Sequence, residues 1–543
     1  MPPVEVAPQT SLHGRLQRYF VPLCAIACGL LWGLEFAPMI AAPMGLDQAW
    51  DLYAANAVLH GVTLNGPRLI EVNPPFLIWF FSLPAMLANA LHLSLSAGFR
   101  LFWILIITGL IAWSTSLYRR VFRTSALGMW LFLLCAMYMA TVPITWGDRG
   151  QREYFTAFLL LPYILWASSR LKSIRLPRAE TFVITTVAAL GVCLKPQHIL
   201  DVVAVELLVL IRLRSLRRWF QPALIALVAG PALYLLAVRI FAPLYLRDIM
   251  PLLQETYWAF NTTWSGMAHT AKKHLIAFAL AIMLFAVLRR RLRIEPLIAC
   301  LLAGATGALL AYAQQHKGWY YQLLTVQIFC YFAVGLIGCD IAERMWLEWG
   351  ARTHRAEDGH LRTPICIGLA VLAFVIAVPL RYRHLQPITY LELQKIRLAA
   401  IYSEYPPGTA VGLLGETPWE WPEVLDQNKV WASRYMHLWL LPAIVRSQDP
   451  LDTDTAHHLS PAKIAELSSL LRRTTAEDLA HWTPKVVVVE EPCNDPDVCA
   501  ALSRIGYSGL LDWFERDPQF RDQWSHYRYQ KTVGDMQVYT RVQ

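Results

Sequence analysis

The stretch Thr145–Phe155, "TWGDRGQREYF", separates two strongly apolar runs at roughly 126–144 and 153–169. About 20 apolar residues are needed for a helix to cross the roughly 30 Å hydrocarbon core of a membrane. The two runs therefore predict two membrane-spanning helices, with the stretch as their junction. The junction is unusual because it concentrates four charged side chains at one membrane face, namely Asp148, Arg149, Arg152 and Glu153.

The composition extends this interpretation to most of the chain. Of its 543 residues, 56% are hydrophobic and only 16% are charged, whereas soluble domains carry about 25% charged residues. The first 18 or so residues are polar and lack the apolar region of a cleavable signal peptide. We therefore expect a polytopic α-helical membrane protein whose first apolar run, from about Tyr19 to Ala42, is an uncleaved span.

Apolar runs recur along the chain and predict about 11 to 13 membrane segments. The net charge of +9 does not indicate nucleic-acid binding, because the basic residues form short clusters between these runs. Such clusters mark the cytoplasmic loops of a bacterial inner-membrane protein. The predicted segments are 19–41, 76–93, 100–118, 126–144, 153–169, 180–195, 198–212, 221–243, 274–288, 294–313, 320–339 and 364–380. The predicted cytoplasmic loops are 119–125, 169–179, 212–220, 289–293 and 340–363.

One segment breaks the alternation of sides. The N-terminal residues 1–18 are cytoplasmic by their arginines, so 42–75 is an outer loop, and two full crossings between 76 and 118 would put Arg119 outside. Proline frees backbone groups that neighbouring helices must satisfy. Because Pro74 and Pro75 precede this region and Pro84 lies within it, we expect one irregular or re-entrant segment beside about 11 full crossings.

The last part of the chain has a different character. The catalytic membrane part is expected over 19–380, and residues 381–543 contain no apolar run long enough to span. Short β-rich runs, "TAVGLLG", "KVVVVEE" and the terminal "MQVYTRV", alternate with helical stretches such as Pro461–Arg473, which predicts a periplasmic α/β domain. Cys493 and Cys499 in "PCNDPDVC" either pair in the oxidising periplasm or remain two free thiols.

The first outer loop contains a predicted helix. It reads "MGLDQAWDLYAANAVLHGVTLNGPRLIEVNPP", and from about Gln48 the apolar residues, including Trp50, recur at helical spacing. Such a helix suits the membrane interface, where Trp and Tyr are favoured. Asp47 and Asp51 are one turn apart, so their carboxylates share a direction, and Asp47 either caps the helix or acts in catalysis. The far end of the loop carries Glu71 and Asn73.

Two further outer junctions carry polar residues. "GVCLKPQHIL" contains Lys195 and His198, and "YAQQHKGWYYQLL" contains His316, Lys317, Trp319 and Tyr320. Taken singly, each is typical of interfacial anchoring. Together with Thr145–Phe155, they place arginine and lysine beside carboxylates on the outer side of the membrane, which should be depleted of basic residues. Arginine and lysine bind phosphate, so the set predicts a site for a phosphate-linked lipid and a hydroxyl to be deprotonated.

These features resemble the GT-C superfamily of membrane glycosyltransferases, which includes the aminoarabinose and protein mannosyl transferases. Within it, "LDQAWDLY…HGVTLNGPRLIEVNPP", "GQRE", "LKPQH" and "KGWYYQ" are similar to a bacterial branch associated with envelope polysaccharides. The resemblance covers about residues 19–380. It implies a polyprenyl-phosphate-linked sugar as donor, a glycan or lipid as acceptor, and the first-loop acidic residue, Asp47, as general base. Many members have a second acidic residue where this chain has Gln48, and histidines at the positions of Tyr154 and Gln322.

The expected site follows from these assignments. Inverting transfer would use Asp47 as the base, with Asp51 nearby. The residues assign no cofactor, and a divalent cation stays an open alternative without a clear carboxylate pair to hold it, because Gln48 replaces half of that pair. The residues expected at the donor phosphate are Arg149, Arg152, Lys195, His198 and Lys317. Those expected to contact substrate are Glu71, Asn73, Gln151, Glu153, His316, Trp319 and Tyr320.

Three questions stay open from the sequence. A transporter or flippase of lipid-linked sugars should show internal repeats and charge at mid-span, and the sequence has neither in recognisable form. A polymerase or ligase of lipid-linked glycans would use the same leaving group and is not distinguished. The aromatic residues of "ETPWEWPEVL", Glu416–Leu425, either stack on a sugar ring or pack inside the C-terminal domain.

Overall fold

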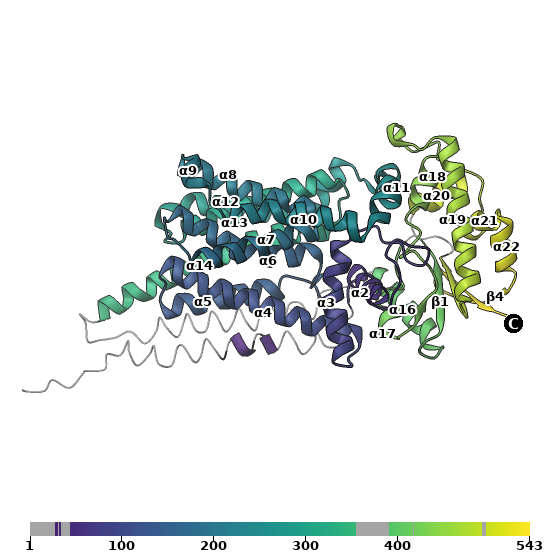
Figure 1. Cartoon of the computed structure of the whole chain (residues 1–543), viewed down its shortest axis with the longest axis horizontal. Helices are drawn as coiled ribbons and strands as arrows, with labels where there is room; N and C mark the ends of the chain where they lie inside the picture. The colour runs from purple at the N-terminus through teal and green to yellow at the C-terminus, as the bar shows by residue number, and fades with distance from the viewer. Residues whose placement is uncertain are drawn as a thin grey trace, which may run out of the picture. The chain divides into compact units, whose positions relative to one another are not determined.

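The computed structural model describes most of the chain (Figure 1). The described residues are 26, 28–30, 32–33, 44–353, 390–415, 417–490 and 496–542. Three predictions lie wholly or largely outside these ranges: the first span at 19–41, the last span at 364–380, and the pairing of Cys493 with Cys499.

Helices account for most of the described residues, and each apolar run predicted between 76 and 339 coincides with one of them. They are α2 (Leu46–Leu59), α3 (Phe76–Ala90), α4 (Leu95–Phe122), α5 (Ala126–Thr141), α6 (Arg152–Leu171), α7 (Arg178–Leu194), α8 (Ile199–Leu213), α9 (Leu216–Trp219), α10 (Leu224–Phe241), α11 (Met250–Thr256), α12 (Trp264–Leu288), α13 (Glu295–Gln315) and α14 (Leu324–Thr353).

Five of the described helices are long and apolar enough to cross a membrane, namely α4, α10, α12, α13 and α14. Two more, α3 and α5, are apolar but shorter. Helix α3 has only 15 residues and contains Pro84, as expected of the irregular segment. Helix α14 extends past the predicted end at 339 to Thr353. The prediction ended where charged residues begin, but charged residues do not prevent a helix from continuing outside an apolar environment.

By its internal contacts the chain divides into two compact units. The first unit comprises Met1–Ala42, Ile104–Pro231 and Ser265–Gln386, and the second comprises Pro43–Trp103, Ala232–Trp264 and Pro387–Gln543. In the first unit, α6 packs against α7 and α13, α13 against α8 and α14, and α14 against α5 (Figure 1).

Helices α8 and α13 make the closest of these contacts. A Cβ atom added to Gly307 of α13 would lie 2.3 Å from the carbonyl oxygen of Leu200 and 2.4 Å from Cα of Asp201. Any side chain at position 307 would therefore push the backbones of the two helices apart. The glycine fixes the start of α8 against α13, and this start carries part of the site described below.

Side-chain contacts link the basic loops at one end of the first unit. Glu343 of α14 accepts a hydrogen bond from the backbone N–H of Ser125 at 2.8 Å and pairs with Arg293. Arg212, at the end of α8, pairs with Glu295 at 2.8 Å. These contacts agree with the prediction that the basic loops share one side. The loops concerned are 119–125, 212–220, 289–293 and 340–363.

The second unit contains a five-stranded sheet of order β2-β1-β3-β5-β4. The strands are β1 (Ala410–Leu414), β2 (Val430–Trp431), β3 (Val486–Glu490), β4 (Tyr527–Val533) and β5 (Met536–Arg541). Strands β2, β1 and β3 are parallel, whereas β5 pairs antiparallel with β3 and β4. The three predicted strands are confirmed as β1, β3 and β5. Strand β4 was not predicted, because an edge strand with the polar sequence "YRYQKTV" has no apolar run.

Helices of the C-terminal region cover this sheet with a continuous apolar core. The longest, α19 (Pro461–Trp482), begins at the capping residue Ser460 and extends the helix predicted at Pro461–Arg473. The remaining helices are α16 (Tyr390–Ser403), α17 (Glu423–Asp426), α18 (Leu441–Arg446), α20 (Pro496–Arg504), α21 (Leu510–Glu515) and α22 (Pro518–Trp524).

The first predicted outer loop packs against the C-terminal region within this unit. The indole rings of Trp50 and Trp421 lie edge to face, with centroids 5.4 Å apart, and the hydroxyl of Tyr53 accepts a hydrogen bond from the N–H of Trp431 at 3.2 Å. Both Trp50 and Trp421 are buried. Trp421 therefore packs inside the fold, and the side of α2 that we expected at the membrane interface has Trp50 covered by protein.

Candidate functional site

Three helix junctions of the first unit meet at the end away from the basic loops. Each contains a short 3-10 helix: η1 (Trp146–Asp148) between α5 and α6, η2 (Pro196–His198) between α7 and α8, and η6 (Tyr320–Leu323) between α13 and α14. We call the charged and polar side chains of these junctions the junction cluster. Its members are Asp148, Arg149, Gln151, Arg152, Glu153, Lys195, His198, Lys317 and Tyr320.

The centre of the junction cluster is a buried ion pair. The ammonium group of Lys195 donates to Oε1 of Glu153, and both side chains are buried. Glu153 lies in the first turn of α6, where a carboxylate is stabilised by the positive end of the helix. Lys195 is held in extended backbone by the proline that follows it, which ends α7. Its ammonium group lies 5.7 Å from the centre of the Tyr321 ring, from the third junction.

The opening stretch contributes the second part. The hydroxyl of Tyr320 donates to Oδ1 of Asp148 at 2.7 Å, which connects the first and third junctions. Arg149 is buried and donates from Nη2 to the carbonyl oxygen of Thr141 at 2.7 Å, at the end of α5. Arg152, the first residue of α6, is also buried. The stretch thus holds two guanidinium groups inside the protein.

His198 pairs with a residue that the sequence analysis did not select. Its Nδ1 lies 2.9 Å from Oδ2 of Asp201, and both side chains are buried. The signal was present in "HILD", because residues three apart on a helix lie side by side. An acidic residue in the first turn of an apolar helix is usually attributed to the helix dipole, so the spacing alone does not single out the pair.

The third junction holds Lys317 between two residues with positive φ, His316 at 55° and Gly318 at 70°. Burial lowers the pKa of Lys317 to about 8, because water that would solvate the ammonium group is excluded. His316 and Trp319 are half-buried in the same loop, and Trp319 stacks on Tyr321 with ring centres 5.8 Å apart.

The first-loop acidic residues belong to the second unit. The capping position of α2 is Gly45, so Asp47 lies in the first turn and is not the capping residue. Asp47 is half-buried and Asp51, one turn further, is buried. The alternative in which Asp47 caps the helix is therefore wrong. A carboxylate in the first turn still stabilises the helix.

Glu71 organises the end of this loop. Its carboxylate accepts hydrogen bonds from the indole N–H of Trp50 and, at 2.6 Å, from the backbone N–H of Asn73. Its own N–H donates to Oδ1 of Asn65 at 2.7 Å. Trp50 lies between Asp47 and Asp51 on α2. Its hydrogen bond to Glu71 therefore fixes the rotation of α2 about its axis, and with it the direction of both aspartate carboxylates.

Tyr154 and Gln322, the two positions at which the resemblance led us to note the absence of histidine, both make hydrogen bonds within the protein. Tyr154 is buried, and its hydroxyl donates to the carbonyl oxygen of Ala140 at 2.9 Å. The amide Nε2 of Gln322 donates to Oε1 of Gln315 at 2.9 Å. Across the described ranges, no group of three or more His, Cys, Asp and Glu side chains is arranged to hold a metal ion.

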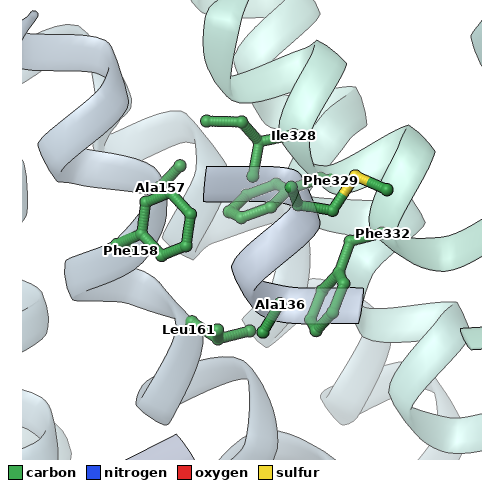
Figure 2. A pocket seen from close by; sticks show the side chains of 8 residues that line it. Ala136, Ala157, Phe158, Leu161, Ile328, Phe329 and Phe332 are labelled. Atoms are coloured by element: carbon green, nitrogen blue, oxygen red, sulfur yellow. The ribbon is translucent and has the colours of Figure 1, made fainter. Parts of the chain in front are cut away.

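An apolar void lies between α5, α6 and α14, apart from these charges. Figure 2 shows that Phe158, Phe329 and Phe332 line it together with small and aliphatic side chains. Its volume is about 10 Å³, which is barely enough for one water molecule. The void is a packing defect of the helices and offers nothing to a polar substrate.

No protein-family model and no curated protein matches this sequence. Two sets of residues are therefore the features of this chain that bear on its function. One is a buried set of cations and carboxylates at three helix junctions, and the other is a pair of carboxylates on the first-loop helix.

Proposed function

We propose that this protein is a membrane glycosyltransferase, a hexosyl- or pentosyltransferase that uses a polyprenyl-phosphate-linked sugar as donor. The acceptor would be a glycan or lipid of the bacterial envelope. In this proposal the chain crosses the inner membrane about 11 times, and the junction cluster, α2 and the C-terminal domain face the periplasm.

The observation that carries the proposal is that two junctions bury cations at the end opposite the basic loops. The first junction buries Arg149 and Arg152, and Lys195 of the second junction shares the neighbouring Glu153 with Arg152. Burying a cation is energetically costly, so buried cations are retained mainly where they pair with a carboxylate or bind a ligand. A lipid-linked phosphate supplies a counter-charge at the depth of a membrane face. Arginine gives two parallel hydrogen bonds to a phosphate, and lysine adds a point charge.

The chemistry would be a single displacement. The carboxylate of Asp47 removes a proton from the acceptor hydroxyl, whose oxygen attacks the anomeric carbon of the donor sugar. The bond from that carbon to the phosphate oxygen breaks, the electron pair stays on the phosphate, and the configuration inverts. General-base catalysis contributes about 10²- to 10⁴-fold, while the cations stabilise the charge that develops on the phosphate.

The test is transfer by the purified protein in lipid nanodiscs, supplied with polyprenyl-phosphoryl sugars extracted from native membranes. We expect Asp47→Asn to lower turnover by about 100-fold or more while leaving donor binding intact. Asp248→Asn is the matched control, because Asp248 is an exposed carboxylate of the second unit that pairs with Arg247. Undiminished turnover of Asp47→Asn would remove Asp47 from the mechanism. In sealed proteoliposomes, which separate the two faces of the bilayer, donor that crosses unchanged would instead indicate a flippase.

A further inference from the structure

A short turn with basic and apolar side chains joins α8 to α10 in the first unit (Figure 1). Helix α8 ends at Leu213, and Arg214 follows it in a left-handed conformation with φ at 49°. Ser215 then caps the one-turn helix α9, because its hydroxyl oxygen accepts a hydrogen bond from the backbone N–H of Arg218 at 3.4 Å. We call residues 214–220 the α9 turn. These local contacts give the turn a defined backbone shape.

The α9 turn is anchored to the interior of the first unit. Arg170 of α6 is buried, and its guanidinium group donates hydrogen bonds to Oε1 of Glu206, at 2.6 Å, and to the backbone carbonyl oxygen of Trp219. The same carboxylate oxygen of Glu206 accepts a hydrogen bond from the hydroxyl of Tyr163 at 2.7 Å. The exposed side chains of the turn therefore project from a backbone that is fixed from inside the protein.

Large apolar and basic side chains are exposed together on the α9 turn. Leu216 is 68% exposed and Phe220 is 52% exposed. The backbone N–H of Phe220 donates to the carbonyl oxygen of Leu216 at 2.8 Å, so the two residues are one helical turn apart and share a face. Arg217 and Arg218 lie between them and are exposed. Within the described ranges, neither guanidinium group forms an ion pair.

The α9 turn continues an apolar face of α8. Val203, Leu207 and Ile211 recur at intervals of four residues, and each of these side chains is more than half exposed. Exposed apolar residues at this spacing form a stripe along one side of a helix. In a membrane protein such a stripe faces the acyl chains, so the turn at its end lies at the level of the headgroups.

The sidedness of membrane proteins explains basic loops by charge alone, and a second basic loop shows the difference. The loop after α12 contains Arg289 and Arg290, both exposed, but the apolar residues that follow, Leu292 and Ile294, are buried. The α9 turn instead exposes apolar and basic side chains together. This combination suits the boundary between the headgroups and the acyl chains of a bilayer.

We infer that the α9 turn is a binding site for the headgroup of an anionic phospholipid. Arg217 and Arg218 contact the phosphate group, while Leu216 and Phe220 lie against the upper part of the acyl chains. A guanidinium group gives paired hydrogen bonds to phosphate oxygens, and basic clusters beside a membrane helix attract anionic lipids. The site goes beyond the proposed sugar transfer and does not depend on it, because it uses none of the residues assigned to that reaction.

The test is lipid retention by the purified full chain in detergent with equal amounts of phosphatidylglycerol and phosphatidylcholine. Native mass spectrometry counts the retained lipids. We expect phosphatidylglycerol to be retained in preference, and Arg217→Gln/Arg218→Gln to weaken its retention by on the order of tenfold. Arg289→Gln/Arg290→Gln is the matched control, because it removes the same charge from a loop that buries its apolar residues, and it should retain the lipid like the unsubstituted chain.

Two further measurements separate the contributions of charge and apolar contact. Leu216→Ser/Phe220→Ser keeps both arginines and should also lower the amount of phosphatidylglycerol retained, because it removes the contact with the acyl chains. In the unsubstituted chain, retention should fall as the salt concentration rises from about 0.1 M to about 1 M, because salt screens exposed charges. The salt series needs no variant, so it tests the site even if a substituted chain does not fold.

Four results would overturn the inference. Equal losses in the two arginine variants would show that only net charge matters. Equal retention of both lipids by the unsubstituted chain would also exclude the site, and is the result expected if the turn binds an acidic protein. Unchanged retention in Leu216→Ser/Phe220→Ser would exclude a position at the bilayer boundary. Retention that does not respond to salt would exclude the contact between arginine and phosphate.

Discussion

At the scale of single residues, the junction cluster combines fixed and titratable cations. Arg149 and Arg152 contribute buried guanidinium groups. Lys317 differs, because burial lowers its pKa to about 8. Below that pH the ammonium form predominates and can attract a phosphate, and above it the neutral amine cannot. The contribution of Lys317 to anion binding is therefore present below about pH 8 and is lost as the pH rises through it.

Lys317→Arg tests this assignment. In the unsubstituted protein, binding of a polyprenyl-phosphoryl sugar should weaken above about pH 8, whereas Lys317→Arg should bind equally well on both sides of that pH, because a guanidinium keeps its proton. Titration of binding in nanodiscs measures the difference. Lys272→Arg is the control, since Lys272 is exposed on α12. If Lys317→Arg weakened with pH as the unsubstituted protein does, Lys317 would not contact the anion.

At the scale of helices and junctions, the positions of the helices could be predicted from the local sequence, but the side-chain pairings between junctions could not. Apolar runs located the helices, and Lys195 and His198 located the break between α7 and α8. The partner of Lys195, however, is Glu153, 42 residues earlier. No periodicity or composition reports such a pairing, and only the sorting of loops by charge suggested that these junctions share a side. The pairing of His198 with Asp201 was readable from spacing, but its meaning depended on the burial of both side chains.

The buried pair gives a prediction about stability. Glu153→Gln should lower the free energy of unfolding by about 3–5 kcal/mol, because it leaves the Lys195 ammonium buried opposite a neutral amide. The double variant Glu153→Gln/Lys195→Met should recover much of this loss. Denaturant or thermal unfolding in detergent measures both. Glu180→Gln is the comparison, because the Arg120–Glu180 pair is partly exposed and should cost under about 1 kcal/mol. Equal losses at positions 153 and 180 would contradict the argument.

At the scale of the whole molecule, the second unit is assembled from three separate segments of the chain. The sequence predicted the C-terminal α/β domain and its three apolar strands, but it assigned 42–75 to the membrane part. The contacts that join this loop to the C-terminal region are single pairs such as Tyr53 with Trp431. Such single contacts produce no recognisable pattern in the sequence of either segment. The sequence therefore could not show that the first loop and the C-terminal region belong to one unit.

The predicted sidedness can be tested on the whole chain. Cysteines introduced at His60 and Leu451, both exposed residues of the second unit, should react with a membrane-impermeant maleimide added to intact cells. A cysteine at Ser173, exposed in a basic loop of the first unit, should react only after the membrane is opened. The unsubstituted chain reports the background from its natural cysteines. Labelling of Ser173→Cys from outside, or protection of Leu451→Cys, would reverse the topology.

The union of the first loop with the C-terminal region has a consequence for biosynthesis. Tyr53 and its partner Trp431 are 378 residues apart, and ribosomes add about 5–20 residues per second, so roughly 20 to 75 seconds separate their synthesis. During that interval the aromatic face of α2 has left the ribosome while the surface that covers it does not yet exist. Maturation of the second unit must therefore wait for the end of translation, and a nascent chain paused before residue 431 would expose Trp50 and Tyr53 to chaperones and proteases.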